Sequence, residues 1–562
     1  MCMKDRLRIG FLLAAVALIY GNVLPNQFVL DDELYITRNA QVVEPSLRAL
    51  FTPNIVSLVF RPLTFATFAL NWAISGAHPL AYHLFNLIFH GAAVWLLYIL
   101  FQELLGDSLE AKNIAFVAAL LYAVHPIHTE AVAWAVGRAE VLAAGFLFAA
   151  WILHLRDRPI ASLACFAMAL LSKESAVAFF PLVILGDFAI GKWKPRTRYA
   201  LVGGLTAAFL GLLWKVQGGR FGQTEINMVD NPLASVSAGW RILNALRVAW
   251  KYVALQVYPA MLSCDYSFNQ IPMYKDWRHT LPAAIAAAAV AAAWIWAIKR
   301  RHVGGVLAGG IYFAGFATTA NILMLTGTIM GERLAYLPSA GFCLLAALGW
   351  NWLRQKKNNV AWGVLVTIVL IFSVRTTLRN RDWKDALALY SSSARAVPNS
   401  TKIHANLANA YLLSDQLDLA DVEFQTALRI DPYSPETLSA YSNLAVRRGN
   451  YQDALDRMRK AMSMSGRNHL DYDSMVVTYA AILMKTNHTD EARENLNREI
   501  LESPQYSPAW SARAVLHLGQ GELKDARSDA QTALQIDRTN LMGMRVLQRL
   551  DAHASPAPES KN

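Results

Sequence analysis

Residues 81–104 read AYHLFNLIFHGAAVWLLYILFQEL, and this apolar run decides the fold of the first part of the chain. A helix needs about 20 apolar residues to cross the hydrocarbon core of a bilayer. Similar runs recur up to about residue 376, and the chain beyond them is more polar. With 55% hydrophobic residues and a mean hydropathy of +0.27, the 562-residue chain is too apolar for a soluble protein. We therefore predict a membrane domain followed by a polar one.

The apolar runs predict an all-α membrane bundle of about 11 spans. The candidate spans are 8–25, 81–104, 110–127, 131–153, 159–172, 175–190, 199–216, 279–298, 305–324, 335–353 and 359–376. Lys and Arg gather in alternate loops between these spans, and such loops face the cytoplasm. The N-terminus is therefore predicted to be cytoplasmic. Because the number of spans is odd, the polar C-terminal domain is predicted to lie outside.

The net charge of +11 would suit a nucleic-acid-binding protein. Many of the basic residues, however, form short clusters between apolar runs, as membrane orientation requires, so we expect no nucleic-acid partner. The four cysteines are scattered without a CxxC motif, which indicates neither a disulfide framework nor a zinc site.

One apolar segment, residues 240–262, does not fit the alternation of basic loops. It carries Arg241, Arg247 and Lys251. If it were a span, the basic residues 299–301 would lie outside. We predict that it lies in the interface, or is re-entrant, on the outer side.

Five polar clusters fall on the outer side in this topology. They are Asp31-Asp32-Glu33, Arg61-Pro62, His125-Pro-Ile-His128-Thr-Glu130, Ser172-Lys173-Glu174-Ser175 and Gly331-Glu332-Arg333. An acidic turn or an isolated ion pair would explain each cluster alone. Charge near a bilayer is costly to desolvate and is usually paired or functional. Five clusters on one face therefore favour a functional site.

Two predicted spans carry further polar residues on one face. Glu130, Trp134 and Arg138 are spaced by four residues, so a continuous helix would align them, and Glu140 lies further into the same span. His83 shares a face of residues 81–104 with His90.

The pair His125 and His128 could bind a metal together with Asp31 and Asp32. A proline-containing elbow with two histidines is more typical of plain hydrogen bonding. No cluster offers a good ligand set at fixed spacing on regular structure, so we expect no tightly held metal and no cofactor.

Several long stretches resemble a known family. They are FVLDDELYITRNAQV, FRPLTFATFALNWAISGAHPLAYHLFNLIFHGAAVWLLY, HPIHTEAVAWAVGRAEVLAAGFLF, LLSKESAVAFFPLVILGDF and GERLAYLPSAGFCLLAA. In order and length they are similar to the transmembrane and tetratricopeptide-repeat-containing O-mannosyltransferases, from about residue 22 into the repeats. That family resembles the GT-C glycosyltransferases, polytopic enzymes that take a sugar from a polyprenyl- or dolichyl-phosphate donor. Compared with the eukaryotic members of the family, this chain is shorter and has fewer repeats, so it looks like a bacterial relative, which would lie in the inner membrane with periplasmic repeats.

The resemblance also implies roles for the outer residues. The acidic motif Asp31, Asp32 and Glu33 would supply the catalytic carboxylate, which accepts the proton of the acceptor hydroxyl in an inverting transfer; either Asp31 or Asp32 can be the base. The leaving lipid phosphate requires fixed cations. The candidate cations are Arg61, Arg138, Lys173 and Arg333, with Arg247 and Lys251 as outsiders. Glu130, Glu174 and Glu332 would orient them, and His83, His125 and His128 complete the candidate substrate-binding set.

The C-terminal part contains a repeat. Ala386, Ala420, Ala454, Ala492 and Ala526 lie 34, 34, 38 and 34 residues apart, which matches the tetratricopeptide period. Such α-solenoids bind peptides in a concave groove, although a purely structural cap would show the same pattern. We predict a membrane catalytic domain over 1–380, a repeat domain over 381–550 and a disordered, Pro- and Ser-rich tail over 551–562.

Three functions are consistent with these features. The leading one is an integral-membrane glycosyltransferase that moves a sugar, mannose by resemblance, from a polyprenyl-phosphate donor to hydroxyls of extracytoplasmic proteins held by the repeats. The alternatives are a transporter or flippase of lipid-linked sugars, and a membrane-anchored repeat scaffold for protein–protein interaction. A scaffold has no need of the outer charges, and transporters usually show internal repeats among their spans.

Overall fold

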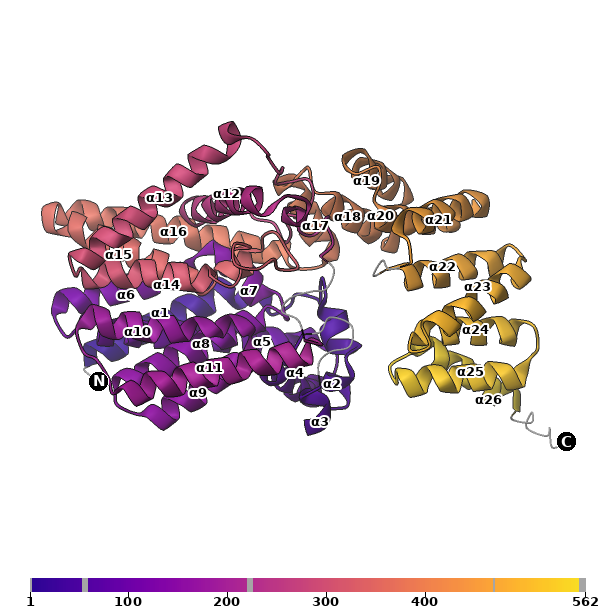
Figure 1. Cartoon of the computed structure of the whole chain (residues 1–562), viewed down its shortest axis with the longest axis horizontal. Coiled ribbons are helices and arrows are strands. Elements are labelled where there is room, and N and C mark those ends of the chain that lie inside the picture. Colours follow the sequence, from indigo (N-terminus) through magenta and orange to yellow (C-terminus); the bar gives the residue numbers. More distant parts are fainter. Residues whose placement is uncertain (1–2, 53–58, 220–225, 468–470, 555–562) are drawn as a thin grey trace. The chain divides into compact units, whose positions relative to one another are not determined.

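The computed structural model describes residues 3–52, 59–219, 226–467 and 471–554. Every regular element in these ranges is a helix, which confirms the predicted all-α fold. The chain forms two compact units, Met1–Ser400 and Thr401–Asn562 (Figure 1). Most of the tail predicted to be disordered, from residue 555 onward, lies outside the described residues.

The first unit contains long apolar helices. Among the described residues, six are long and apolar enough to cross a membrane: Met3–Val23 (α1, Met3–Tyr20, with η1), α5 (Pro79–Leu105), α8 (Arg138–Leu155), α11 (Arg196–Val216), α13 (Trp277–Lys299) and α16 (Asn358–Asp382). Helix α6 (Leu109–Val124) and the segment Pro126–Ala133 pass the same test together, with a bend of 51°. The predicted count of about 11 spans stays a prediction.

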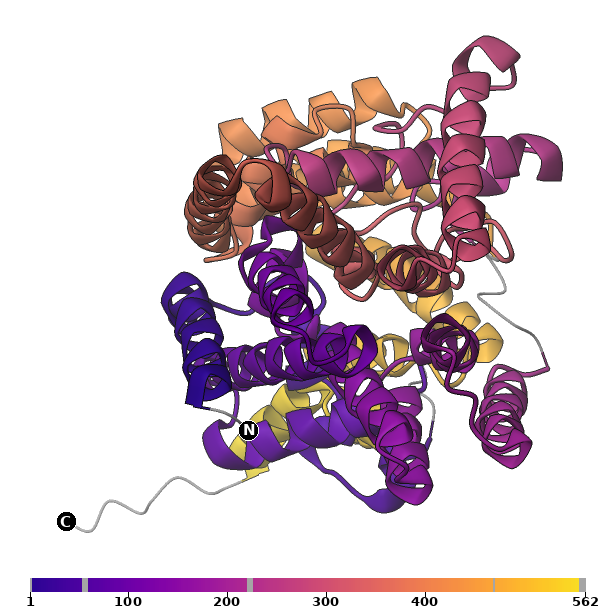
Figure 2. The same ribbon diagram turned by 90° about the vertical axis from the view of Figure 1, so that its left-hand side faces the viewer.

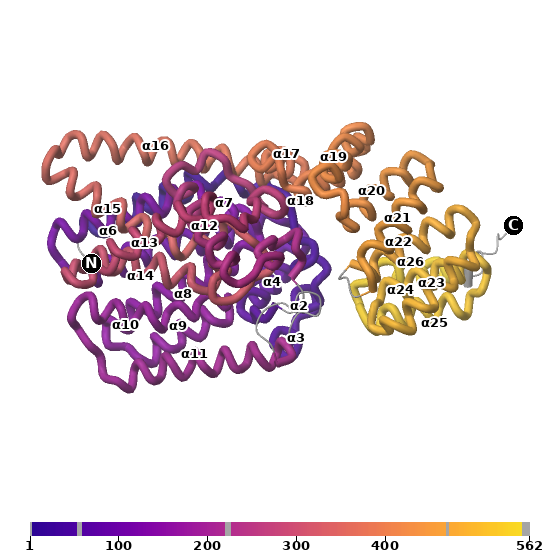
Figure 3. Tube along the Cα trace, turned by 45° about the horizontal axis from the view of Figure 1, so that its top comes forward, coloured from indigo at the N-terminus to yellow at the C-terminus, as the bar shows by residue number. Residues whose placement is uncertain are grey.

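Six further helices of the first unit do not pass this test on their own. They are α4 (Pro62–Ser75), α9 (Pro159–Ser172), α10 (Phe179–Ile190), α12 (Ala238–Val257), α14 (Val303–Phe316) and α15 (Pro338–Lys356). Figure 3 shows many of the helices of this unit running side by side, and Figure 2 shows the indigo α1 at the edge of the bundle. Helix α12 covers the segment predicted to lie in the interface, and it is not among the helices that meet the spanning criteria.

The core of the first unit lies where α5, α6, α8 and α15 pack together. Leu97 of α5, Ala118 of α6, Leu147 of α8 and Leu344 of α15 are fully buried. In a bilayer such contacts are stabilised by close packing, because the lipid tails are as apolar as the side chains.

The boundaries of these helices follow from local sequence. The side chain of His78 accepts a hydrogen bond from the backbone of Leu80, and Pro79 occupies the first turn of α5. The helix ends at Gly106, whose φ of +93° favours glycine. Ser108 then caps α6 by accepting a hydrogen bond from Ala111.

The second unit is a series of paired helices, which confirms the predicted repeat fold. The pairs are α18 (Thr401–Leu413) with α19 (Leu417–Ile430), α20 (Pro435–Arg447) with α21 (Tyr451–Ser465), α22 (Tyr472–Lys485) with α23 (Thr489–Glu502), and α24 (Ser507–Gly519) with α25 (Leu523–Ile536), followed by α26 (Leu541–Ala554). Ala420, Ala454, Ala492 and Ala526 are fully buried, each near the start of the second helix of its pair. The spacing of 34 residues therefore marks the place where paired helices touch.

Helix α17 (Ala386–Ala396) belongs to the first unit. The backbone N–H of Cys264 donates to the Ser393 hydroxyl (3.3 Å), and that of Asn269 donates to the Asn399 carbonyl (2.8 Å). The sequence placed a boundary at residue 380, and the compact unit continues beyond it to Ser400.

Candidate functional site

The first outer loop gives Asp31 and Asp32 opposite environments. Asp32 is fully buried, and its two carboxylate oxygens accept hydrogen bonds from the backbone N–H groups of Val29 (3.0 Å) and Val136 (3.1 Å). Burial raises the pKa of Asp32 to about 8. Asp31 is exposed. Asp32 therefore ties the loop to the segment before α8 and leaves Asp31 at the surface.

Glu33, the third member of the acidic motif, points elsewhere. Its carboxylate accepts a hydrogen bond from Arg38 (2.8 Å), and both side chains are more than 60% exposed. Exposed pairs of this kind contribute little to stability. The structure does not bring Glu33 to the charged residues described below.

Arg61 and Glu174 form the first of three cation–carboxylate pairs. Arg61 lies at the N-cap of α4, and Glu174 begins the short helix η4 (Glu174–Ala178). The guanidinium donates through Nε (3.1 Å) and Nη2 (2.7 Å) to the two carboxylate oxygens. Arg61 is 20% exposed and Glu174 47%, so solvent or a ligand can reach the pair.

Lys173 and Glu140 form the second pair, which is buried. Lys173 follows the last residue of α9, Glu140 lies in the first turn of α8, and the lysine ammonium donates to the carboxylate. Helices α8 and α9 pack closely, which brings the two side chains together. Burial lowers the pKa of Lys173, and the charge of Glu140 opposes that shift.

Glu130 and Arg333 form the third pair. Glu130, in α7 (Thr129–Ala133), accepts from the Arg333 backbone N–H (2.8 Å) and from its guanidinium. The guanidinium also lies over the Trp134 ring, 5.1 Å from its centroid. Burial alone would lower the pKa of Arg333, but the charge and hydrogen bond of Glu130, together with the charges of Glu140 and Asp31, raise it. Arg333, in η6 (Glu332–Ala335), remains 26% exposed.

The three pairs lie near one another. The charges of Arg61, Glu174 and Arg333 all act on Lys173, and the charge of Asp31 acts on Arg333. Asp31, Arg61, Glu174 and Arg333 are the members that solvent reaches. We call these four residues, with Lys173, Glu130 and Glu140, the charged site.

An irregular segment between α7 and α8 positions one side of this site. The Asn86 side chain donates to the carbonyls of Val132, Trp134 and Ala135 (3.3, 2.9 and 3.3 Å). A Cβ at Gly137 would lie 2.6 Å from the Glu130 carbonyl oxygen, so only glycine fits there. The prediction that one continuous helix aligns Glu130 with the residues after it is therefore wrong, because the backbone leaves the helix at this break.

Arg138 is buried beneath the site rather than exposed in it. Its guanidinium donates to the Asn86 side chain (2.7 Å), the Thr67 hydroxyl (3.2 Å) and the Tyr82 carbonyl (2.9 Å). It also lies over the Phe68 ring, at 4.6 Å. Because Arg138 is fully buried and three of its N–H donors are taken by the protein, it is not placed to meet a phosphate, contrary to its predicted role.

The three candidate histidines are buried and hydrogen-bonded. His83 Nε2 lies 3.1 Å from the Asn26 carbonyl. His125 bonds the Gln256 carbonyl (3.0 Å) and the Ile127 N–H (3.2 Å). His128 bonds the Tyr122 carbonyl (2.9 Å) and the Ser339 hydroxyl (2.7 Å). The contacts of His125 and His128 hold the elbow between α6 and α7 in place.

In the described part of the chain, one group of side chains has the spacing of a metal site. It is His517, Glu522 and Asp525 in the second unit. Glu522 there already accepts from Arg493 (3.0 Å), a cation that disfavours a metal ion beside it.

Glu332 does not orient a cation of the site, contrary to its predicted role. One carboxylate oxygen accepts from the Ser263 N–H (2.6 Å) and the Tyr266 hydroxyl (2.6 Å). Burial raises the pKa of Glu332 to about 7. The cation-orienting carboxylate that sequence reasoning missed is Glu140, and its only signal was a charge within a predicted span.

The two outlying cations lie along α12. Arg247 donates to the Pro272 carbonyl (2.8 Å) and lies over the Tyr274 ring, at 4.3 Å. The Lys251 ammonium is 4.8 Å from the centroid of the Tyr266 ring. The same helix supports the site through Tyr252, whose hydroxyl lies 3.0 Å from both the N and the O of Gly331.

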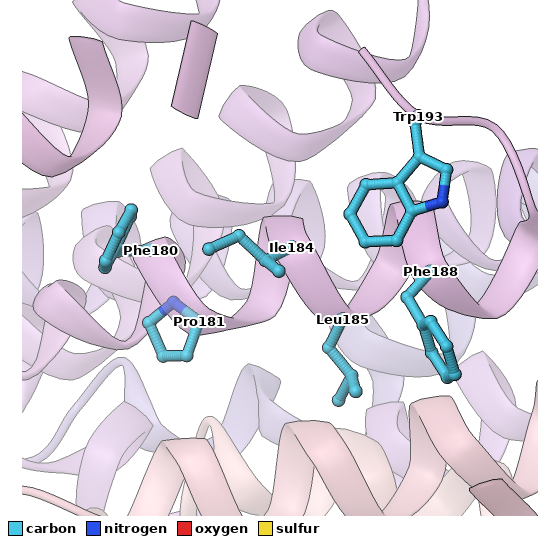
Figure 4. Close-up of a pocket in the computed structure, with 6 residues that line it drawn as sticks. All are labelled: Phe180, Pro181, Ile184, Leu185, Phe188 and Trp193. Atoms are coloured by element: carbon cyan, nitrogen blue, oxygen red, sulfur yellow. The ribbon is translucent and has the colours of Figure 1, made fainter. Parts of the chain in front are cut away.

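An apolar pocket runs along α10, which follows directly after η4 and thus begins close in sequence to Glu174. Its volume is about 360 Å³, and its lining side chains are Phe180, Pro181, Ile184, Leu185, Phe188 and Trp193 (Figure 4). These side chains offer almost only carbon to an occupant, which favours a hydrocarbon chain.

Comparison with known proteins identifies relatives of the whole chain. No family model matches. A protein O-mannosyl-transferase of Caenorhabditis elegans is 33% identical over 380 residues, which cover 66% of this chain and 54% of the relative. Protein O-mannosyl-transferase TMTC3 of Mus musculus is 26% identical over 605 residues, covering 95% of this chain and 64% of the relative. The chain thus spans about half to two thirds of the length of these relatives.

Among solved structures, the APC/C hetero-tetramer Cut9–Hcn1 aligns with a TM-score of 0.29 and 12% identity, over 87% of this chain and 92% of that chain. YrrB, a tetratricopeptide-repeat protein, aligns with a TM-score of 0.24 and 14% identity, over 35% and 97%. Both sequence relatives are protein O-mannosyl-transferases, so the predicted resemblance of this chain to the transmembrane and tetratricopeptide-repeat protein O-mannosyltransferases is confirmed.

Proposed function

We propose that the protein is an integral-membrane O-mannosyltransferase. It takes mannose from a polyprenyl-phosphate donor and transfers it to hydroxyl groups of extracytoplasmic proteins. The observation that carries this proposal is the charged site, in which carboxylates orient three cations and the charge of the exposed Asp31 acts on one of them, Arg333. The similarity to protein O-mannosyl-transferases supports the choice of sugar and of acceptor.

Asp31 is the proposed general base. A base must first lie within reach of the proton that it accepts. Asp31 is exposed, whereas Asp32 is buried with both oxygens occupied by backbone N–H groups. Asp32 then acts as a positioning residue, because it fixes the loop that presents Asp31.

The transfer is a single displacement with inversion. The acceptor hydroxyl loses its proton to the Asp31 carboxylate while its oxygen forms the new bond to the anomeric carbon. The bond from that carbon to the phosphate oxygen breaks, and its electron pair stays on the lipid phosphate. Arg61 and Arg333, the exposed cations of the site, stabilise the developing negative charge.

The apolar pocket along α10 is the proposed place for the isoprenoid chain of the donor. The pocket is lined by carbon, and its helix begins a few residues after Glu174. The cations would then hold the phosphate while the groove holds the tail. The repeats of the second unit are proposed to hold the acceptor polypeptide.

The proposed location is a bacterial inner membrane, with the N-terminus in the cytoplasm and the repeats outside. The alternation of basic loops supports this orientation, because loops rich in Lys and Arg face the cytoplasm.

Transfer can be tested with the purified full-length chain in detergent. Radiolabelled polyprenyl-phosphate mannose and a Ser- or Thr-containing protein acceptor are expected to give labelled protein. GDP-mannose, which lacks the lipid, is expected to give none. An equal yield from both donors, or label on the lipid alone, would contradict the proposed donor.

A further inference from the structure

A second cavity, with charged residues in its lining, lies at the C-terminal end of α16. Its volume is about 150 Å³, and it is enclosed by that helix, by α17 and by residues 260–262. A water molecule occupies about 30 Å³ of liquid, so the cavity has room for a small oxyanion. None of the charged residues that line it belongs to the charged site.

Guanidinium groups dominate the charge of this cavity. Arg375 lines it and is held in place by the carbonyls of Pro259 and Ala260, both at 3.1 Å. Arg395 also lines it and is exposed, and within the described residues it forms no ion pair. The carboxylate among the lining residues is Asp382.

A third guanidinium, that of Arg379, contacts two of the residues that line the cavity. Arg379 is fully buried, and its Nη1 donates to Asp382 (3.1 Å) and to Ser392 (3.1 Å), two lining residues. Its Nε and Nη2 meet no acceptor in the described part of the chain. Buried donors without a partner are costly. Glu332 is the further carboxylate whose charge acts on Arg379, and it is held by Ser263 and Tyr266.

Helix α16, which lines the cavity, also carries exposed apolar side chains that suit lipid. Ile371, Val374 and Leu378 on the same helix are each about half exposed or more. Met261, which lines the cavity, is 53% exposed. Arginines near the end of a span normally reach the headgroup region while their neighbours contact acyl chains.

We propose that this cavity binds the phosphate oxyanion of an anionic lipid headgroup. Guanidinium groups bind phosphate through paired, charge-assisted hydrogen bonds. Arg375 and Arg395 supply them directly, and Arg379 adds positive charge behind. The site is separate from the donor site proposed above, and its occupation does not depend on mannose transfer.

Binding can be measured by native mass spectrometry of the full-length protein in detergent. Phosphatidylglycerol is the anionic probe, phosphatidylcholine the neutral one, and inorganic phosphate the competitor. Wild type is expected to retain phosphatidylglycerol in preference to phosphatidylcholine. Arg395→Ala removes one exposed guanidinium, and we expect about tenfold weaker retention of phosphatidylglycerol. Arg381→Ala is the matched control, because Arg381 is exposed on the same helix and does not line the cavity.

If inorganic phosphate displaces phosphatidylglycerol, and this displacement depends on Arg395, the site recognises the phosphate group alone. No competition supports a site that needs headgroup and tail together. A structural role for Arg395, at the carbonyl end of α17, predicts a lower unfolding midpoint with unchanged lipid retention. That result, equal retention of both lipids, or equal loss in the Arg381 variant would overturn the proposal.

Discussion

Asp31 and Asp32 are adjacent in sequence but differ in what surrounds them. Their charge and their place after the first span were readable from sequence. The sequence did not show which of them reaches solvent. Asp32 is buried and hydrogen-bonded to Val136, which lies about a hundred residues further along the chain. The burial of Arg138 was not readable from sequence either, because its guanidinium donates to residues of α4 and α5. Burial depends on contacts between helices that no local pattern predicts.

Replacing Asp31 tests the proposed base directly. Asp31→Asn removes the proton acceptor while keeping the size of an exposed side chain, so the protein should fold and insert normally. We expect about 10²–10⁴-fold less transfer from polyprenyl-phosphate mannose. Glu33→Gln is the matched control, since Glu33 is an exposed neighbour paired with Arg38. Equal loss in both variants would mean that the loop, rather than Asp31, is required.

Asp32→Asn is expected to act on stability. An amide offers one acceptor oxygen, so one of the two backbone N–H groups now held by Asp32 loses its partner. We expect a loss of about 1–3 kcal/mol in the free energy of unfolding.

The pH dependence of Asp32→Asn has a defined sign. The pKa of Asp32 is raised to about 8 in the folded protein, above its usual value of about 3.9. The folded state therefore binds the extra proton between these values, and the contribution of Asp32 to stability falls as pH rises through this window. Asn does not titrate, so the penalty of the substitution should be larger at pH 5 than at pH 8. Unfolding in detergent at both values measures it, and a penalty that grows with pH would contradict the assignment.

Several residues of the charged site lie at the ends of helices. The sequence predicted some of these ends and missed others. Arg61, Lys173 and Glu174 lie where α4 begins, where α9 ends and where η4 begins. The gap between the candidate spans 159–172 and 175–190 marked Lys173 and Glu174, whereas Arg61 precedes a helix that was not among the candidate spans. The partner of Lys173 was not readable, because it depends on α8 packing against α9. The unwound segment before α8 was missed as well, because the spacing of its residues fits a helix.

Two carboxylates of similar role should respond differently to substitution. Glu140→Gln leaves the Lys173 ammonium buried without its counter-charge, and the two side chains are only 7% and 6% exposed. Breaking a buried pair in this way costs about 3–5 kcal/mol. Glu174→Gln, in a pair open to solvent, should change stability by about 1 kcal/mol or less. It should still reduce transfer, because Arg61 loses the carboxylate that orients it.

Thermal unfolding and transfer assays on both variants separate these effects. The assignment of Glu140 to a structural pair would be wrong if Glu140→Gln were as stable as wild type.

Across the whole molecule, the fold of the second unit was predicted most fully. A period of 34 residues fixes where small side chains must lie, and the buried alanines occupy those places. The end of the first unit was harder to predict from the sequence. Helix α17 has the sequence of a repeat helix, but the segment that contains it is hydrogen-bonded to residues 264 and 269 of the first unit. The predicted boundary at residue 380 separates sequence patterns, whereas the compact unit ends at Ser400.

Two truncations distinguish these boundaries and test the proposed division of labour. A chain ending at Ser400 keeps α17 and its contacts with the first unit, so Asp31, Arg61, Lys173 and Arg333 remain in place. It should still transfer mannose to a short peptide at high concentration. It should lose transfer to protein acceptors at low concentration, because binding energy remote from the reacting hydroxyl comes from the repeats.

A chain ending at residue 380 should fail with both acceptors. It loses the hydrogen bond from the Gln27 N–H to the Lys384 carbonyl (2.8 Å), which anchors the segment before Asp31, and that between Cys264 and Ser393. Labelled transfer to peptide and to protein, measured for both truncations after equal membrane insertion, decides the matter. If the chain ending at Ser400 loses peptide transfer as completely as Asp31→Asn does, the repeats are part of the catalytic fold, because their removal then acts on the reacting groups rather than on acceptor binding.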